Sequence, residues 1–182
     1  GDSTVAFTLE NRGAGRQELM TNSAFDNWNG DLPVDWEENE VGSNTYGQEA
    51  GEGGVSAPSL TVDFPSFDNA NRATLRYVGK QNDGGIWENH QVTYWGKGTN
   101  GALGYWKSTD GTTWESAGVV AATAGTIDWT FAIGQVQSIV AENPDEWSTV
   151  TTLNLEGTAY YDDISWKATL NTAAGLGDWD EY

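Results

Sequence analysis

A run of seven residues near the end of the chain, Tyr-Tyr-Asp-Asp-Ile-Ser-Trp at 160–166, restricts the fold more than any other stretch. Aromatic and β-branched residues alternate there with polar ones, which is typical of a half-buried strand and not of a helix. Because successive side chains of a strand point to opposite faces, Asp162 is expected to share one face with Tyr160 and Trp166. A carboxylate buried on that face needs a cation or several hydrogen-bond donors.

Residues 22–28, Asn-Ser-Ala-Phe-Asp-Asn-Trp, are the best candidate for the partner of Asp162. The two stretches lie far apart in the sequence, at a separation that strand pairing in a β-sandwich routinely spans. We therefore expect the beginning and the end of the domain to meet, with Phe25 and Trp36 in the core.

The rest of the sequence predicts an all-β protein. The 182 residues are enough for one domain with a sizeable core. The chain has 23 Gly, ten Trp and short apolar runs separated by turn residues. Residues 59–64, 72–78 and 147–155 alternate as strands do. Asn-Gly at 100–101 predicts a tight hairpin between the strands on either side of it, and Asp-Gly at 110–111 predicts a second hairpin.

The charge of the chain limits its partners. Twenty-seven acidic residues against eight basic ones give a formal net charge of −19. Such a field repels nucleic acid and anionic membrane surfaces, and it suits divalent cations and neutral ligands such as glycans. No apolar run approaches the ~18 residues of a membrane span. The chain has no cysteine, so it forms no disulfide and uses no thiol chemistry.

The sequence gives no support to a catalytic role. His90 is the only histidine, and its polar neighbours indicate an ordinary hydrogen-bonded residue. The nucleophile motif G-x-S-x-G is missing, which argues against triad chemistry. Acidic residues are so abundant that no pair stands out as the two carboxylates of a glycosidase. We therefore expect a protein that is not an enzyme.

Residues 19–36 contain Asn-Ser-Ala-Phe-Asp, an aromatic residue shortly after, and Leu-Pro-Val-Asp-Trp. This order resembles the opening of jelly-roll carbohydrate-binding modules, which read Asn-x-x-Phe-(Glu/Asp) and then Leu-Pro-x-x-Trp. The stretch at 160–166 resembles their last strand, which carries Asp-Asp-(Val/Ile). The resemblance implies an antiparallel, jelly-roll-like β-sandwich over residues 19–168. An N-terminal strand or arm (1–18) and an acidic C-terminal tail (169–182) would flank it.

The resemblance also implies a structural calcium ion. In this sequence the matching ligands would be Asp26 and Asp162, or else Asp163, with loop carbonyls completing the oxygen shell that calcium prefers. Asp26 stands where the family most often has Glu. The alternative is that backbone N–H groups alone satisfy the two carboxylates of the last strand.

Glycan binding would need aromatic side chains that face solvent, together with polar partners. Ten tryptophans cannot all be core in a domain of this size. The densest aromatic region predicts the carbohydrate-binding residues Trp87, Gln91, Tyr94, Trp95 and Trp106. Tyr94 and Trp95 point to opposite faces of one strand, so only one of them can be exposed.

The resulting hypothesis is a non-catalytic module that attaches to a neutral glycan or polysaccharide, in an extracellular, cell-surface or virion-surface setting. The alternative is a structural assembly subunit, such as a virion decoration protein or a surface-filament subunit. Val5, Phe7 and Leu9 form an apolar stripe that would suit pairing with a neighbouring subunit. The chain would then form a homo-oligomer or contact a capsid or filament neighbour.

Overall fold

The computed structural model of this chain describes residues 16–38, 44–64, 73–81, 86–98, 101–122, 126–136, 146–153 and 157–171. Within these residues the regular structure is strand, and no helix occurs. Parts of three predicted features lie outside them: residues 1–15 of the N-terminal strand or arm, Asn100 of the Asn-Gly turn, and the tail beyond residue 171.

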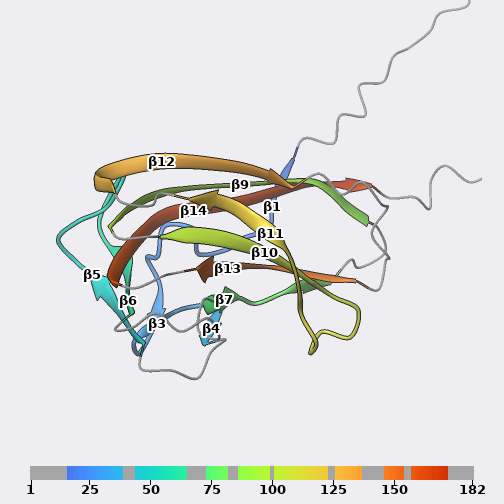
Figure 1. The fold of residues 1–182 in the computed structure, drawn as a ribbon, viewed down its shortest axis with the longest axis horizontal. Coiled ribbons are helices and arrows are strands. Elements are labelled where there is room, and N and C mark those ends of the chain that lie inside the picture. Colours follow the sequence, from blue (N-terminus) through green and yellow to red (C-terminus); the bar gives the residue numbers. More distant parts are fainter. Residues whose placement is uncertain are drawn as a thin grey trace, which may run out of the picture.

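Two antiparallel sheets stack as the layers of a sandwich (Figure 1). The strands of the first sheet are β5 (Thr45–Glu49), β6 (Ser59–Phe64), β9 (Ile86–Gly98), β12 (Thr126–Val136) and β14 (Gly157–Asn171). Their order is β12-β9-β14-β6-β5, and β1 (Gln17–Glu18) also pairs with β14. The described end of the predicted arm thus adds to the first sheet.

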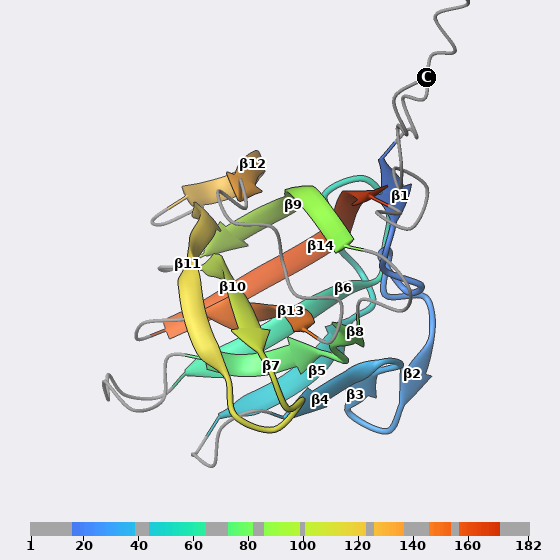
Figure 2. The same ribbon diagram turned by 90° about the vertical axis from the view of Figure 1, so that its right-hand side faces the viewer.

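The second sheet contains β4 (Trp36–Glu38), β7 (Ala73–Tyr77), β10 (Ala102–Ser108), β11 (Glu115–Ala122) and β13 (Trp147–Leu153). Their order is β11-β10-β13-β7-β4, and β8 (Lys80–Gln81) also pairs with β13. A small separate ribbon joins β2 (Trp28–Asn29) to β3 (Leu32–Pro33). Figure 2 shows β11 and β12 beside each other, each as the edge strand of its own sheet.

The core lies between the sheets and is filled from alternate positions of their strands. Leu60 and Val62 of β6 face inward, as do Leu103 and Tyr105 of β10, and all four are fully buried. This alternation follows from the two-residue repeat of a strand, and it confirms the all-β prediction for these segments.

Aromatic rings tie the opening motif to the last strand, as the sequence predicted. Phe25 and Trp36 are buried. Their ring centroids lie 5.9 Å apart, and Trp36 lies 5.8 Å from Tyr77, which in turn lies 6.5 Å from Trp166 of β14. Tilted and edge-on ring pairs at these distances stabilise a core beyond the area that they bury.

The inward face of β14 changes phase within the Asp-Asp pair. Tyr161 is buried before the pair and Ile164 is buried after it. Pairing with β9 has a register shift that begins after Asp162, and Asp163 has a φ of 45°. These are the marks of a β-bulge, in which an extra residue shifts the alternation. The prediction that Tyr160 and Asp162 share a face with Trp166 is therefore wrong. Tyr161 takes the core position, while Tyr160 and Asp162, which lie opposite Lys97 and Trp95 in the register, point to the outer side of the sheet.

The predicted hairpin around Asn-Gly at 100–101 is also wrong. The strands on either side of it, β9 and β10, belong to different sheets, and β10 pairs with β11 and β13. Turn residues signal that the chain reverses, but not which sheet receives the next strand. The second predicted hairpin is confirmed, since β10 and β11 pair antiparallel around Gly111, whose φ is 73°.

Candidate functional site

The predicted carbohydrate-binding residues do not form one cluster. Tyr94 is fully buried in the core, whereas Trp95 lies on the outer side of the first sheet, where Gln91 shares its face. Trp106 lies on the outer side of the second sheet, because its neighbour Tyr105 points into the core. The side chain of Trp87 lies outside the described residues, and only its backbone pairing in β9 is described. The sandwich therefore separates Trp95 from Trp106 by its full thickness.

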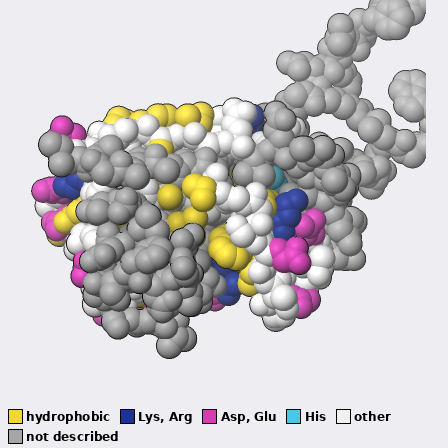
Figure 3. All heavy atoms as spheres, viewed as in Figure 1, with side chains coloured by type: hydrophobic (Ala, Val, Ile, Leu, Met, Phe, Trp, Pro, Cys, Tyr) yellow, Lys and Arg dark blue, Asp and Glu magenta, His cyan; other side chains and the backbone are white. Residues whose placement is uncertain are grey.

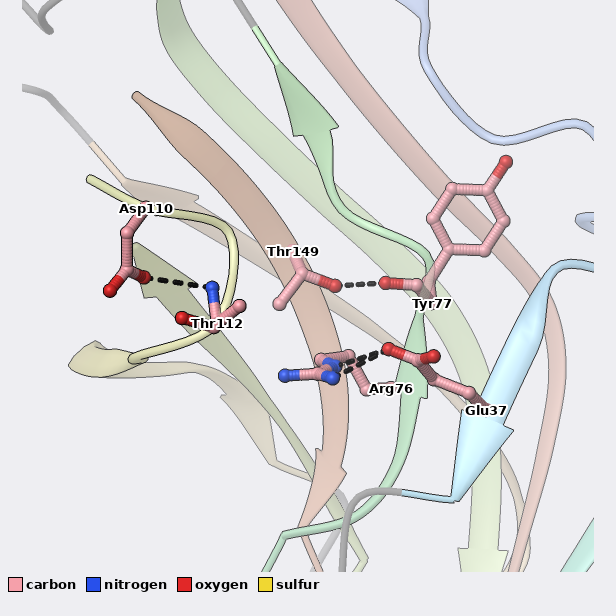
Figure 4. Close-up of polar contacts among 6 residues, drawn as sticks. All are labelled: Glu37, Arg76, Tyr77, Asp110, Thr112 and Thr149. Carbon is pink, nitrogen blue, oxygen red and sulfur yellow. Dashed lines mark hydrogen bonds and ion pairs between the residues drawn. The ribbon is translucent and has the colours of Figure 1, made fainter. Parts of the chain in front are cut away.

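The outer side of the second sheet carries a group of polar and aromatic side chains around Trp106. Trp106 lies opposite Thr149 in the register of β10 and β13. In the adjoining row Thr151 lies opposite Gly104 on one side and Arg76 on the other. We call Arg76, Trp106, Trp114 and Thr151 the Trp106 face (Figure 4 shows Arg76 and the neighbouring Thr149).

Arg76 is held in place from two directions. Its Nε lies 2.8 Å and its Nη2 lies 2.6 Å from the same oxygen of Glu37 on β4 (Figure 4). Its guanidinium lies over the ring of Trp114, 4.7 Å from the centroid. A cation in this position is attracted by the ring face, so Arg76 fixes Trp114 against the sheet.

The turn between β10 and β11 delivers Trp114 to this face. The carboxylate of Asp110 accepts a hydrogen bond from the amide of Thr112 at 2.8 Å (Figure 4). It also accepts hydrogen bonds from the amide of Thr113 at 2.6 Å and from the hydroxyls of Thr113 and Ser108. The hydrogen bond from the Thr113 amide is the largest of these effects, which together hold the pKa of Asp110 well below its ordinary value. These hydrogen bonds fix the conformation of the turn. The Trp114 ring at its end packs on Gly79, where an added Cβ would lie only 2.6 Å from the ring.

Three polar atoms of the Trp106 face are buried without a hydrogen-bond partner: Nε1 of Trp106, Nε1 of Trp114 and Oγ1 of Thr151. Thr151 is only 1% exposed although it points away from the core. A Cβ added at Gly104 would lie 3.1 Å from Nε1 of Trp106, so the indole N–H edge lies over that glycine, next to Thr151. Buried polar atoms are normally paired with protein groups or ordered water, so these three atoms distinguish the Trp106 face from the rest of the sheet.

Sequence reasoning found Trp106 but missed Arg76, Trp114 and Thr151. The alternation of β7 and β13 does place Arg76 and Thr151 on outward faces, which was the available signal. The position of Trp114 could not be predicted from the sequence, because it depends on a contact with Arg76, which lies on a distant strand of the same sheet.

The outer side of the first sheet carries a second aromatic group, and the chain itself contacts most of it. Trp95 lies 5.5 Å from Phe131 between centroids. The ammonium of Lys97 lies 5.1 Å from the ring of Trp129 and 4.6 Å from the ring of Tyr160. Lys97 also pairs with Glu52, and Gly54 of the same loop packs directly on Trp95.

Asp162 is wholly buried, as the sequence predicted, but it lies on the outer side of the first sheet opposite Trp95, and its partners differ from the expected ones. Its Oδ2 accepts hydrogen bonds from the amides of Gly54 at 2.6 Å and Val55 at 3.2 Å, and its Oδ1 accepts one from the amide of Asp163 at 2.9 Å. The loop between β5 and β6 therefore provides the donors, and not residues 22–28. Backbone N–H groups offset the desolvation of this carboxylate.

Asp163 is the residue of β14 that meets the opening motif. The amide of Ile164 donates to the carbonyl of Ser23 at 2.9 Å, which brings residues 22–28 beside it. Oδ2 of Asp163 is buried without a partner. Burial first, and then the charges of Asp162 and Asp26, raise the pKa of Asp163.

The fit of these acids to a metal ion is partial. An orphaned carboxylate oxygen beside a second carboxylate suits a cation, and this describes Asp163 with Asp26. Asp162 suits it less, because both of its oxygens already accept hydrogen bonds. Across the part of the chain that is described, no group of three His, Cys, Asp or Glu side chains is gathered as a metal site.

His90 belongs to the core and to no site. It is 1% exposed, and the indole N–H of Trp166 donates to its Nδ1 at 3.0 Å. An indole nitrogen only donates, so Nδ1 is the acceptor and Nε2 carries the proton. Nε2 donates to the hydroxyl of Tyr105 at 3.1 Å, and that hydroxyl donates to Ser148 at 2.7 Å. This chain of hydrogen bonds joins the two sheets.

Among the described residues, no helix is long and apolar enough to cross a membrane. No protein-family model matches the chain, and no curated protein matches it in sequence. Solved structures do match it in fold. The CBM22-2 xylan-binding domain of Xyn10C from Paenibacillus barcinonensis gives a TM-score of 0.57 at 14% identity, over 76% of this chain and 94% of that domain.

Two further structures are similar. The C-terminal family 22 carbohydrate-binding module of Clostridium thermocellum Xyn10B gives a TM-score of 0.54 at 11% identity, over 80% of this chain and 90% of that module. The enzymatically active domain of tailspike protein 4 from bacteriophage CBA120 gives 0.50 at 12% identity, over 83% of this chain and 21% of that chain. These identities show a likeness of fold. The chain is an antiparallel β-sandwich of the kind found in carbohydrate-binding modules.

Proposed function

We propose that the chain is a non-catalytic module that binds a neutral polysaccharide on the Trp106 face. One observation carries the proposal: a single sheet face holds three buried, unpartnered polar atoms, two indoles and a guanidinium. Sugar hydroxyls would accept hydrogen bonds from Nε1 of Trp106 and Trp114 and would pair with Oγ1 of Thr151. The C–H faces of sugar rings would pack on the indoles, as apolar groups pack on aromatic rings.

The three atoms are shielded from solvent in the free chain. A ligand that reaches them must therefore turn the side chain of Trp106 or Trp114, a change of rotamer that is common when proteins bind. We expect affinities in the micromolar-to-millimolar range, about −4 to −8 kcal/mol. Two neighbours of the same fold, described as a xylan-binding domain and a carbohydrate-binding module, support the choice of ligand class. Such a module would act outside the cell, on a cell surface or on a virion.

Two acids near this face are unsuited to the role of a glycosidase acid. A glycosidase needs a carboxylic acid whose pKa is raised, so that it holds a proton for the leaving group. Asp110 has a lowered pKa and stays ionised. Glu37 is engaged by Arg76 through two nitrogens.

The test compares two tryptophans on opposite faces. Trp106→Ala should abolish retardation on xylan or another neutral polysaccharide in affinity electrophoresis, while Trp95→Ala should keep it. Far-UV circular dichroism of both variants checks the fold. If Trp95→Ala alone abolishes binding, the ligand lies on the first sheet, where Gln91 and Trp95 remain predicted contacts. If neither change weakens binding, both faces are excluded.

We also propose that a calcium ion binds at Asp163 and Asp26. Asp162 would keep its hydrogen bonds to the amides of Gly54 and Val55. The orphaned Oδ2 of Asp163 and the repulsion that it receives from two acids support this assignment. When bound, the ion would neutralise that charge and join β14 to the opening motif. Oxygen ligands of this kind are the ones that calcium prefers.

A further inference from the structure

The outer edge of the first sheet is an unusual edge strand. β12 pairs with β9 in a regular register from Thr130, opposite Gly96, to Val136, opposite His90. Within the described residues nothing pairs with its other edge. An edge strand of this kind exposes a row of free N–H and C=O groups that can accept another strand.

The other sheet edges carry features that block pairing. In β12 such features, Asp128 and a register shift, occur only before Thr130, and residues 130–136 lack them. β4 bears Glu37 and Glu38, and β5 ends at Glu49. β11 begins at Glu115 and contains two register shifts in its pairing with β10. Charges and bulges are the usual protection of edge strands. Residues 129–136 of β12 contain no charged residue and no proline, although 19% of the chain is charged.

The strand also presents large apolar side chains to solvent. Phe131 is 51% exposed and Ile133 is 55% exposed, and both point away from the core. Hydrophobic side chains form a row along the upper edge of the molecule in Figure 3, where β12 runs in Figure 1. An uncharged, apolar, unpaired strand of this length is an association surface.

We propose that two copies of the chain pair antiparallel through their β12 strands, around a twofold axis at Ala132. This register sets Phe131 of each copy opposite Ile133 of the other, on the same outer face. The pairing is self-complementary, as a twofold interface requires. It joins the two first sheets into one continuous sheet, and the Trp106 face of each copy stays uncovered on the opposite layer.

The distribution of charge along β12 permits a second copy as the occupant. Each copy carries a formal charge of −19, so a self-contact must keep acids apart. In the proposed register Asp128 of one copy lies opposite Val136 of the other. The two Asp128 residues are then eight positions apart along the paired strands, about 27 Å at ~3.4 Å per residue. This exceeds the Debye length of ~8 Å at physiological ionic strength, so their repulsion is screened. A basic partner would find no carboxylate within residues 129–136.

The test measures the mass of the full chain by light scattering over a range of concentrations, at ~0.15 M salt, where the Debye length is ~8 Å, and at 0.5 M added salt. We expect a rise to twice the chain mass and no further. Ile133→Lys should return the mass to that of one chain, because two lysines would face an apolar strip. Val119→Lys is the matched control: Val119 is 64% exposed on the neighbouring edge strand β11, and its replacement should leave the dimer intact.

Cysteine pairing tests the register, since the chain has no cysteine of its own. A mixture of the Phe131→Cys and Ile133→Cys variants should form a disulfide between the two variants in higher yield than either variant forms alone. A single-chain mass at both salt concentrations overturns the proposal. So does a dimer that survives Ile133→Lys, a dimer lost equally in Val119→Lys, or a mass that grows beyond two chains. All of these readouts are made without glycan, so they stand apart from the binding test.

Discussion

Replacing Asp162 by Asn removes one charge from the centre of the Asp-Asp pair while keeping the shape of the side chain. The buried carboxylate accepts three backbone hydrogen bonds, from Gly54, Val55 and Asp163. Asn has a single acceptor oxygen, so its NH₂ group must face either the two loop amides or the amide of Asp163. In both orientations a donor faces a donor inside a buried site.

Hydrogen bonds to a charged group contribute about 1.5–3 kcal/mol each. The whole sum is not lost, because Gly54 and Val55 lie in a loop whose amides can reach water once the loop opens. We therefore expect Asp162→Asn to lower the free energy of unfolding by about 2–4 kcal/mol. The loop between β5 and β6 should also detach from Trp95, on which Gly54 packs.

Urea unfolding followed by tryptophan fluorescence gives the free energy, and amide hydrogen exchange reports the loop. The amides of Gly54 and Val55 should lose protection at low urea, before the core amides of β14 do. Asp163→Asn is the matched control, because its Oδ2 accepts no hydrogen bond. A change below about 0.5 kcal/mol, which is ordinary for surface sites, with full protection at Gly54 and Val55, would refute this account of Asp162.

Further predictions concern the same strand and the core. Because the pKa of Asp163 is raised, the folded chain binds more protons than the unfolded chain between about pH 4 and that pKa. The free energy of unfolding should therefore fall as the pH rises through this window. Asp163→Asn should flatten that fall, as measured by urea titrations with chelator present. Calcium should raise the unfolding midpoint of the wild type by several degrees relative to excess chelator, and equal midpoints would remove the metal from the account. Asp163→Asn should abolish the calcium effect. Tyr105→Phe removes the buried hydroxyl between His90 and Ser148 and should cost about 1–3 kcal/mol in chemical unfolding, and an unchanged midpoint would contradict the assigned network.

The amino-acid pattern alone determined much of the sandwich. A period of two over β6 and β7 is a local property, because the chain's own geometry turns successive side chains to opposite faces. The sequence also predicted that Phe25 and Trp36 are core, and the structure agrees. Asp162 is buried as predicted, but on the other face of β14, under the loop that contains Gly54. The opening and closing motifs also meet, through Ile164 and Ser23.

Tertiary structure decided what each strand pairs with and where each face points. A bulge of one residue in β14 exchanged the roles of Tyr160 and Tyr161, and no periodicity reveals a single inserted residue in advance. The turn residues between β9 and β10 predict a hairpin, but the two strands belong to separate sheets and bury their apolar faces against each other across the core.

The candidate site shows the same division. The alternation of side chains along β10 predicts that Trp106 points away from the core. The other residues of its face come from three other parts of the chain: Arg76 on β7, Trp114 on a turn and Thr151 on β13. Pairing between distant segments depends on the summed burial of both sheets, which no single window of sequence contains. The sequence determined which side chains alternate, and the fold decided which of them meet.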